Sequence, residues 1–281
     1  FNYLGSLLIT SLLTEEPHRM VETLINNDFS KPVSADTDET EVALLFEQRN
    51  LISAPVIDEN NQLVGRITID DVVDVIRDQA EHSVMSMVGL DEDEDVFAPI
   101  IQSSKRRSVW LGVNLVTAFI AVYFIGLFEA TLQQKIALAI LMPVVASMGG
   151  IAGTQTLIIV TRGIATGRVT TANIKTLINK EVAVSGLNGI IWSIVIGLIT
   201  YYWFADLLLS LIIALAIITN LVVAAFSGAF LPLLLSKLKI DPALAGGVIL
   251  TTITDVIGFV AFLGLAALFI LSPIHIGGCR G

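Results

Sequence analysis

Five long apolar stretches follow Arg107, and they constrain the fold of this chain more than any other feature. A helix needs about 20 apolar residues to cross the hydrocarbon core of a membrane, and each stretch reaches that length. We therefore expect five membrane helices, near Val109–Phe128, Ile136–Val160, Val182–Ala205, Leu207–Leu235 and Pro242–Leu271. The third and fourth stretches meet at Asp206 almost without a loop, which predicts a tight hairpin. The sequence predicts an all-α membrane domain over residues 105–272 and a short tail over residues 273–281.

The positive charges of the membrane domain predict how it is oriented. Lys135 and Arg280 fall on one side of the five expected helices. The other basic residues fall on the opposite side: Lys105, Arg106, Arg107, Arg162, Arg168, Lys175, Lys180, Lys237 and Lys239. Cytoplasmic loops carry an excess of Lys and Arg, so we expect a multi-pass protein of the cell membrane with a cytoplasmic N-terminal region and an external C-terminus.

The residues before Lys105 have a different composition, because 21 of the 26 acidic residues lie there. A soluble region with this charge argues against nucleic-acid binding and favours divalent cations as ligands. It also contains a repeat with an offset of 60 residues, in which Leu4–Leu13 aligns with Val64–Val73. Each copy predicts a short apolar strand that passes into a helix, and Ala54–Asp58 adds a strand before the second copy. The predicted fold class is a multi-domain membrane protein with an α/β region before the helices.

This repeat resembles a pair of CBS modules over residues 1–79, with the first module truncated and the second at about 30–79. The adenosine-phosphate signature of that family is matched by Gly65, Thr68 and Asp71, so ATP or another adenine nucleotide is a candidate ligand. Helix capping explains Thr68 and Asp71 equally well, because both residue types are favoured in the first turn of a helix. In the first copy, Leu8 replaces the threonine, which argues against a nucleotide there.

An acidic connecting segment follows, over residues 80–104, and its helical pattern begins already at Asp70. Like charges at helical spacing repel, and a divalent cation would relieve that repulsion. The pattern is also typical of a solvated helix face, so both interpretations stand. The candidate ligands of a regulatory cation site are Asp70, Asp71, Asp74, Asp78, Glu81, Asp91 and Asp95.

Two features inside the apolar stretches predict a path for cations. Asp255 is the only charged residue between Pro242 and Leu271, and an ionisable side chain at that depth marks a functional site. Residues 143–156 combine a proline, three glycines and small polar side chains, which predicts a broken helix that lines water. The candidate pore ligands are Asp255, the Thr251 and Thr252 hydroxyls, the Gly149 and Gly150 carbonyls and Asn220. Alternatively, the glycines permit close helix packing and Asn220 bonds between helices.

Three motifs give the chain a resemblance to the MgtE family of magnesium channels over nearly its whole length. They are Met148–Gln155, Leu231–Leu234 with Asp241–Leu244, and Thr251–Asp255. The resemblance implies a homodimer with its pore on the two-fold axis, in which Asp255 holds hydrated Mg²⁺. It also implies a cytoplasmic gate that Mg²⁺ closes by binding between the CBS modules and the connecting (plug) helix. Ile151 departs from the family, which commonly has asparagine there, and the family's N-terminal helical domain has no counterpart in this sequence, so we expect a fragment of a longer protein.

Three hypotheses about function remain from the sequence. The first is a Mg²⁺-selective channel that cytoplasmic Mg²⁺ closes, and the second is a proton-coupled carrier of divalent cations that uses Asp255. The third is a nucleotide-sensing membrane protein without transport. The sequence has no phosphate-binding glycine loop that ends in Lys-Ser or Lys-Thr, and its His and Cys residues are scattered, so we expect neither ATP-driven pumping nor a transition-metal site. No nucleophile, base and orienting residue occur together, so we expect no enzyme.

Overall fold

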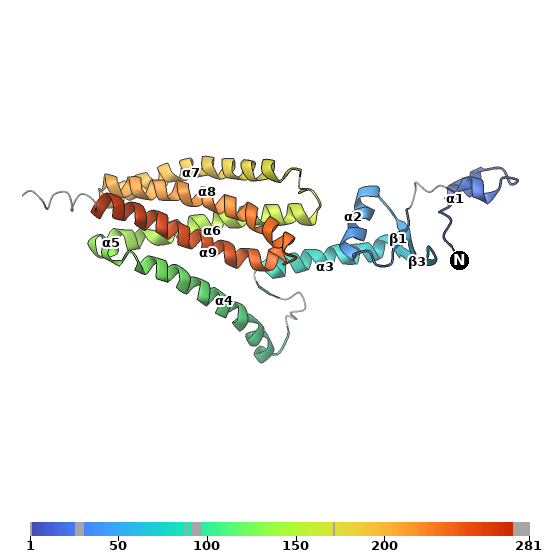
Figure 1. The fold of residues 1–281 in the computed structure, drawn as a ribbon, viewed down its shortest axis with the longest axis horizontal. Helices are drawn as coiled ribbons and strands as arrows, with labels where there is room; N and C mark the ends of the chain where they lie inside the picture. The colour runs from blue at the N-terminus through green and yellow to red at the C-terminus, as the bar shows by residue number, and fades with distance from the viewer. Residues whose placement is uncertain (1, 26–30, 88, 91–96, 171, 272–281) are drawn as a thin grey trace, which may run out of the picture. The chain divides into compact units, whose positions relative to one another are not determined.

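The computed structural model describes the chain apart from residues 1, 26–30, 88, 91–96, 171 and 272–281. The chain forms two compact units, residues 1–83 and 84–281. Figure 1 shows the strands in the first unit and a bundle of long helices in the second.

The N-terminal unit is a small α/β structure, as the sequence predicts. Its sheet has the order β1-β2-β3, where β1 is Val33–Ser34, β2 is Ser53–Ile57 and β3 is Leu63–Thr68. Strand β2 is parallel to β1 and antiparallel to β3. Helix α2 (Glu39–Arg49) covers the sheet, and helix α3 (Ile69–Met87) follows β3 directly. The apolar side chains between them form the core of this unit: Val33, Val42, Ala43, Phe46, Ala54 and Val72.

The prediction of a strand in the first copy of the repeat is wrong. Residues 4–8 form no strand, and only an isolated bridge between Asn2 and Gln62 pairs this region with the sheet. The second copy has β2 as a hydrogen-bonding partner for β3, whereas among the described residues no strand pairs with residues 4–8. A β-strand of a sheet pairs its backbone amides and carbonyls with those of a neighbouring strand, and residues 4–8 lack this pairing. The helical part of that copy survives as the short α1 (Ile9–Thr14), which a single turn of 3₁₀-helix (Val21–Leu24) follows.

Among the described residues, the second unit contains five helices that are long and apolar enough to cross a membrane, which confirms the expected number. They are α4 (Ile100–Gly126), α6 (Ile136–Ala165), α7 (Ile174–Phe204), α8 (Leu207–Lys237) and α9 (Pro242–Ala266). A short α5 (Glu129–Gln134) links the first two, and a π turn (Ala267–Leu271) ends the bundle. Helix α4 begins nine residues before the predicted Val109 because its basic first turns are helical as well.

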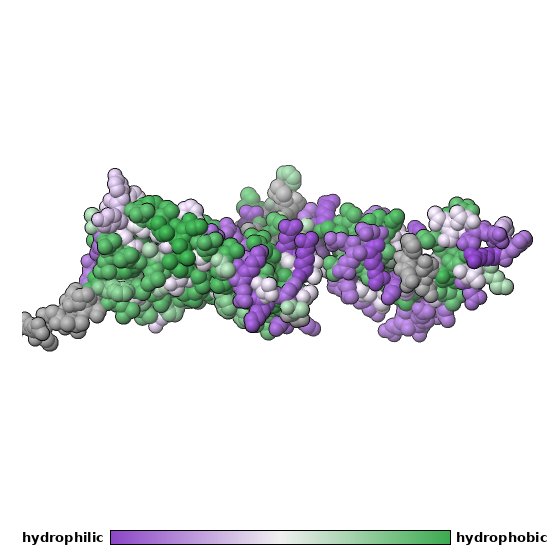
Figure 2. Space-filling view, turned by 90° about the horizontal axis from the view of Figure 1, so that it is seen from above, coloured by the Kyte–Doolittle hydropathy of each residue, from purple (hydrophilic) through white to green (hydrophobic). Residues whose placement is uncertain are grey.

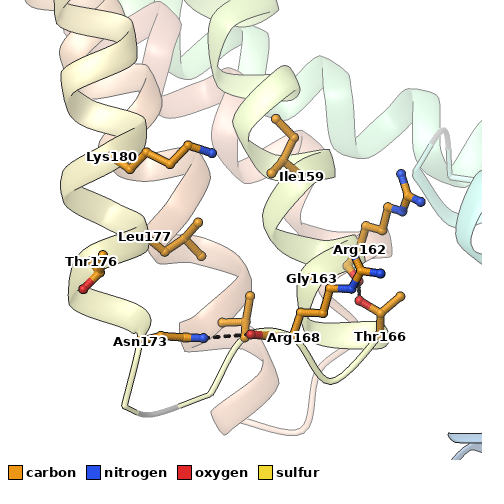
Figure 3. Close-up of a pocket in the computed structure, with 10 residues that line it drawn as sticks. Ile159, Arg162, Gly163, Thr166, Arg168, Asn173, Thr176, Leu177 and Lys180 are labelled. Carbon is orange, nitrogen blue, oxygen red and sulfur yellow. Dashed lines mark hydrogen bonds between the residues drawn. The ribbon is translucent and has the colours of Figure 1, made fainter. Parts of the chain in front are cut away.

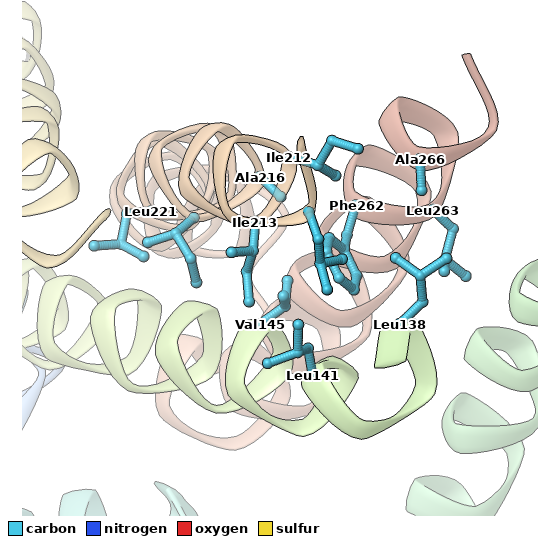
Figure 4. Packing of buried hydrophobic residues seen from close by; sticks show 12 residues of the cluster. Leu138, Leu141, Val145, Ile212, Ile213, Ala216, Leu221, Phe262, Leu263 and Ala266 are labelled. Carbon is cyan, nitrogen blue, oxygen red and sulfur yellow. The ribbon is translucent and has the colours of Figure 1, made fainter. Parts of the chain in front are cut away.

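Helix α8 is the centre of the bundle, because half of its apolar span is buried, against 6% for α4. Its side chains pack between those of α6 and α9 in the main core cluster, which Figure 4 shows around Ile213, Val145 and Phe262. In Figure 1, α4 diverges from the other helices along its length. Hydrophobic residues cover much of the surface of the helical unit in Figure 2. This apolar surface requires lipid or another protein chain as its neighbour.

The α7–α8 hairpin is as tight as the sequence predicts. Ala205 turns the chain with a left-handed φ of 48°, and Asp206 caps α8 by accepting a hydrogen bond from the Leu209 amide at 3.0 Å. The other Asp206 oxygen accepts from the Lys135 ammonium, and Lys135 precedes the first residue of α6. This ion pair lowers the pKa of the Asp206 carboxyl. One carboxylate therefore fixes the ends of three helices on one side of the bundle.

Replacing Asp206 with alanine should lower the free energy of unfolding by about 1 kcal/mol, because the cap of α8 is lost. An asparagine side chain can still cap the helix, so Asp206→Asn should lose only the smaller contribution of the partly exposed ion pair. Because the pKa of Asp206 is lowered in the folded protein, its charge stabilises the fold above the pKa of the unfolded chain, and this contribution disappears as the pH falls through the lowered value.

Thermal unfolding in detergent at neutral and acidic pH measures both effects. The difference between wild type and Asp206→Asn should vanish in acid. Equal stability of wild type and Asp206→Ala at neutral pH would contradict the capping role.

Candidate cation path in the membrane helices

Asp255 lies on α9 and is the only charged side chain of that span. It is partly exposed, and among the described residues its carboxylate forms no hydrogen bond or ion pair. A carboxylate without a protein partner is costly within lipid unless it faces water or binds a cation. The geometry of α9 therefore keeps Asp255 open to a ligand.

Two threonines lie one turn before Asp255 on the same side of α9. The Thr251 hydroxyl donates to the Gly247 carbonyl at 2.9 Å, and the Thr252 hydroxyl donates to the Val248 carbonyl at 2.8 Å. Their hydrogens are used by the helix, so their oxygen lone pairs are directed outward and can accept from water or hold a cation. Thr251 is exposed and Thr252 partly exposed. Three oxygen-bearing side chains thus share one open face, because residues three and four apart are neighbours on a helix.

The predicted break in the second membrane helix is wrong. Helix α6 is continuous from Ile136 to Ala165 and passes through Pro143, Gly149 and Gly150 without interruption. Pro143 removes one amide donor, and a single lost hydrogen bond does not open a helix that packs well against its neighbours. The carbonyls of Gly149 and Gly150 belong to helical backbone, so they are not the free oxygen ligands that a broken helix would expose. A cation path along these helices would need side chains and water as its ligands.

Asn220 of α8 explains why two helices next to it have glycine. Its side chain is fully buried, and its Nδ2 donates to the Val145 carbonyl of α6 at 2.9 Å. A Cβ on Gly149 of α6 would overlap this amide, and a Cβ on Gly258 of α9 would come within 2.7 Å of its nitrogen. Asn220 therefore occupies a space that the two glycines leave open. The structure places it between helices and away from the exposed face with Thr251, and its Oδ1 has no partner among the described atoms.

Further close contacts set the relative depth of α6 and α9. Gly153 of α6 faces Leu250 of α9, and Gly246 of α9 faces Leu157 of α6. Residue numbers rise along one helix as they fall along the other, so the two helices are antiparallel. This register places Asp255 close to the level of Gly149. Asp255 and the glycine motif of α6 therefore lie at one depth, as their central positions in the two segments predict.

The exposed polar side chains of α6 are not among the candidate ligands predicted from the sequence. Ser147, Thr154 and Gln155 are exposed, whereas Gly149 and Gly153 on the other side of the helix are buried. The available signal was their spacing of seven and eight residues on an otherwise apolar helix. Ile151 is on the exposed side as well, with 57% of its surface accessible. This face of α6 is open to lipid, water or a second chain.

In the N-terminal unit, Thr68 and Asp71 bind each other. The amide and the hydroxyl of Thr68 both donate to Oδ2 of Asp71 at 3.0 Å. This arrangement caps α3, as one of the two interpretations of the motif predicts. Gly65 lies in β3, and the space next to its α-carbon is empty within 4 Å. An adenine nucleotide would have to replace the bonds between Thr68 and Asp71, so its binding stays a prediction.

The acidic side chains of α3 are exposed and spread along the helix. Asp74, Asp78 and Glu81 are all exposed, and the Arg77 side chain contacts Glu81 at 3.3 Å. Asp70 and Asp71 lie in the first turn. In the described ranges, no three His, Cys, Asp or Glu side chains lie close enough together to hold a metal ion. Asp91 and Asp95 lie outside the described residues. A regulatory cation would therefore need ligands from a further surface.

Comparisons with known proteins agree with this division of the chain. Residues 142–265 match the family model of MgtE, a divalent cation transporter, and residues 27–78 match the CBS domain. The chain is 34% identical over 270 residues to "Magnesium transporter MgtE" of Bacillus subtilis (strain 168). It is 29% identical over 269 residues to the protein with this name from Thermus thermophilus, and 27% identical over 265 residues to the one from Enterococcus faecalis.

These matches cover 94–95% of this chain but only 58–59% of each relative. The chain thus spans less than two thirds of the length of the relatives that it matches. The matching family and relatives are transporters and not enzymes, in agreement with the expectation from the sequence.

Gly149→Ala should destabilise the bundle by about 1–3 kcal/mol, because the new methyl group would overlap the Asn220 amide. That amide is fully buried, and moving it would break its hydrogen bond to the Val145 carbonyl. Gly150→Ala is the matched control. Nothing lies within 4 Å of a Cβ there, and alanine raises helix propensity by about 1 kcal/mol.

Thermal unfolding of the two variants in detergent tests this packing. Gly149→Ala should unfold at a lower temperature than wild type, and Gly150→Ala at the same or a higher temperature. The reverse order would show that Asn220 does not fill the gap left by Gly149.

Proposed function

We propose that this chain, which is similar to the MgtE family of divalent cation transporters, carries Mg²⁺ across a membrane along a path at Asp255. The observation that carries the proposal is the open face of α9, where a carboxylate without a partner among the described residues lies one turn from two hydroxyl oxygens. The membrane part of the match, residues 142–265, contains all of these residues. The names of the relatives support Mg²⁺ as the transported ion.

The chemistry of Mg²⁺ fits such a sparse set of oxygens. The ion is small and dehydrates reluctantly, so proteins usually hold it through one or two carboxylates while it keeps several waters. Continuous helix α6 offers no free carbonyl ring that could replace the hydration shell. The waters of a hydrated ion would donate hydrogen bonds to the Thr251 and Thr252 oxygens, and the charge of Asp255 would attract the ion to that depth.

We further propose that two copies of the chain enclose the path. One copy leaves Asp255 partly exposed and the polar side chains of α6 exposed, so a single chain does not separate an ion from lipid. A two-fold axis next to this face would bring two Asp255 carboxylates and two polar faces of α6 together. Helix α4 is almost entirely exposed and could also pack against the second copy.

For regulation, we propose that cytoplasmic Mg²⁺ closes the path by binding to the acidic side chains of α3 together with a facing surface. Repulsion among Asp74, Asp78 and Glu81 falls when a divalent ion lies between them and that surface. The ion then favours the compact arrangement in proportion to its difference in affinity for the two arrangements, typically about 1–3 kcal/mol. The excess of basic residues at one end of the helices supports a cytoplasmic position for this unit.

Asp255→Asn should reduce Mg²⁺ flux by more than about tenfold. The substitution keeps the shape of the side chain and removes a charge whose attraction for an ion about 4 Å away amounts to several kcal/mol in a protein. Glu129→Gln is the control, since it removes one carboxylate charge outside the long spans. A Mg²⁺ indicator inside liposomes with equal amounts of each protein measures the flux. Wild-type flux through inserted Asp255→Asn protein would rule out the role that we assign.

Neutralising Asp74, Asp78 and Glu81 together should weaken inhibition by cytoplasmic Mg²⁺. The Mg²⁺ concentration needed for half inhibition should rise by about 5- to 150-fold, which corresponds to typical coupling energies. Ion preference should stay unchanged, because the Asp255 region is intact. The matched control neutralises Asp36, Glu47 and Glu59, which are exposed elsewhere in the same unit, and so removes the same amount of negative charge. Patch-clamp current against internal Mg²⁺ gives the inhibition curves. Superimposable curves for wild type and the α3 variant would leave these side chains as a solvated face.

A further inference from the structure

A cavity of about 480 Å³ lies where α6 ends and α7 begins, far along α6 from the Asn220 contact. Figure 3 shows ten residues that line it, and they include a cationic group and an apolar group. Arg162, Arg168 and Lys180 are cationic, and Ile159, Val169 and Leu177 are apolar. In the figure, the Lys180 side chain extends from α7 towards α6. The cavity therefore joins a positive rim to an apolar wall.

The turn that carries Arg168 is held in place by its own backbone. Gly167 has a left-handed φ of 63°, and its amide donates to the Ile164 carbonyl at 3.0 Å. The Arg168 amide donates to the Gly163 carbonyl at 2.9 Å, which completes the glycine-dependent helix end known as a Schellman motif. Gly163 has no side chain, and Val169 packs over it, since a Cβ there would lie 2.6 Å from Val169.

Asn173 holds the same turn from the other side. Its Nδ2 donates to the Arg168 carbonyl at 2.8 Å, and its Oδ1 accepts from the Thr170 amide at 2.9 Å (Figure 3 shows the first bond). Asn173 is also the residue before α7, so the positive end of a 31-residue helix borders the cavity. The backbone next to Arg168 is thus fixed before any ligand arrives, which reduces the entropy lost on binding.

The charges around this cavity are unbalanced. None of the ten described lining residues is acidic, and the sequence has no Asp or Glu between Glu129 and Glu181. In the described part of the chain, neither Arg162 nor Arg168 has a carboxylate partner. Lys180 contacts Glu181 at 3.5 Å but stays largely exposed. Because Arg162, Arg168 and Lys180 all border this cavity, an anion bound there would lower the repulsion among their charges.

We propose that this cavity binds a phosphate group. Arginine matches phosphate oxygens with paired hydrogen bonds, and amides at the start of α7 can donate to the same anion. The phosphate could belong to the headgroup of an anionic phospholipid or to free inorganic phosphate. The apolar wall formed by Ile159, Val169 and Leu177 favours the lipid, because basic pockets between membrane helices bind such headgroups. This site is separate from Asp255 and does not depend on Mg²⁺ transport.

Native mass spectrometry of the purified protein with added phosphatidylglycerol tests the proposal. Wild type should retain one lipid per chain, and the variant with Arg162→Gln and Arg168→Gln should bind it at least about tenfold more weakly, from the loss of charge-assisted bonds. The matched control carries Lys237→Gln and Lys239→Gln, which remove two charges from the other loop at the same end of the helices. It should bind like wild type.

Inorganic phosphate added as a competitor distinguishes the two sources. Displacement of the lipid by phosphate at similar concentrations supports free phosphate as the ligand, and retention of the lipid supports the headgroup. If the double variant unfolds early, Arg168→Gln alone is the second test, since the backbone and not this side chain holds the turn. Equal binding of both phosphatidylglycerol and inorganic phosphate by wild type and the arginine variants would overturn the proposal.

Discussion

The hydrogen bond from Asn220 to the Val145 carbonyl fixes the place where α6, α8 and α9 meet. Lipid gives a buried amide no alternative partner, so the bond is worth more to the position of the helices than its small net energy suggests. The amide fits only because Gly149 and Gly258 present no side chains to it. Gly258 lies three residues after Asp255, so the same contact sets the depth and direction of the carboxylate. The candidate path depends on this packing.

The buried and exposed sides of the same helices have separate roles. Glycines and aliphatic side chains hold α6, α8 and α9 together on the inside, whereas Asp255, Thr251 and the polar residues of α6 remain on the outside. Such an outer face is unstable against lipid and suits a hydrated cation, which needs charge and hydrogen-bond acceptors but no tight cage. The proposal of a second copy follows from this geometry, since only an opposing polar face would keep both water and ion from the hydrocarbon.

The sequence predicts the parts of this structure that depend on composition and spacing. The length of the apolar stretches predicts five helices. The third and fourth stretches meet at Asp206 almost without a loop, which predicts the α7–α8 hairpin. The isolated charge of Asp255 identifies the candidate site. Features that depend on partners far along the chain were not predicted. Gly149 and Pro143 indicate a broken helix by composition, but packing against Asn220 keeps α6 continuous. The strand expected at residues 4–8 has no neighbouring strand among the described residues, and the basic cavity arises only from the turn after α6.

Mg²⁺ entry into liposomes that contain the purified protein, with a Mg²⁺ gradient and equal pH on both sides, tests the central claim most directly. A channel-like path predicts that Mg²⁺ enters down its own gradient and that the internal pH stays constant, because no proton is exchanged. Entry that requires a proton gradient would instead make Asp255 the exchange site of a coupled carrier. Entry no faster than into protein-free liposomes would contradict transport by this chain altogether.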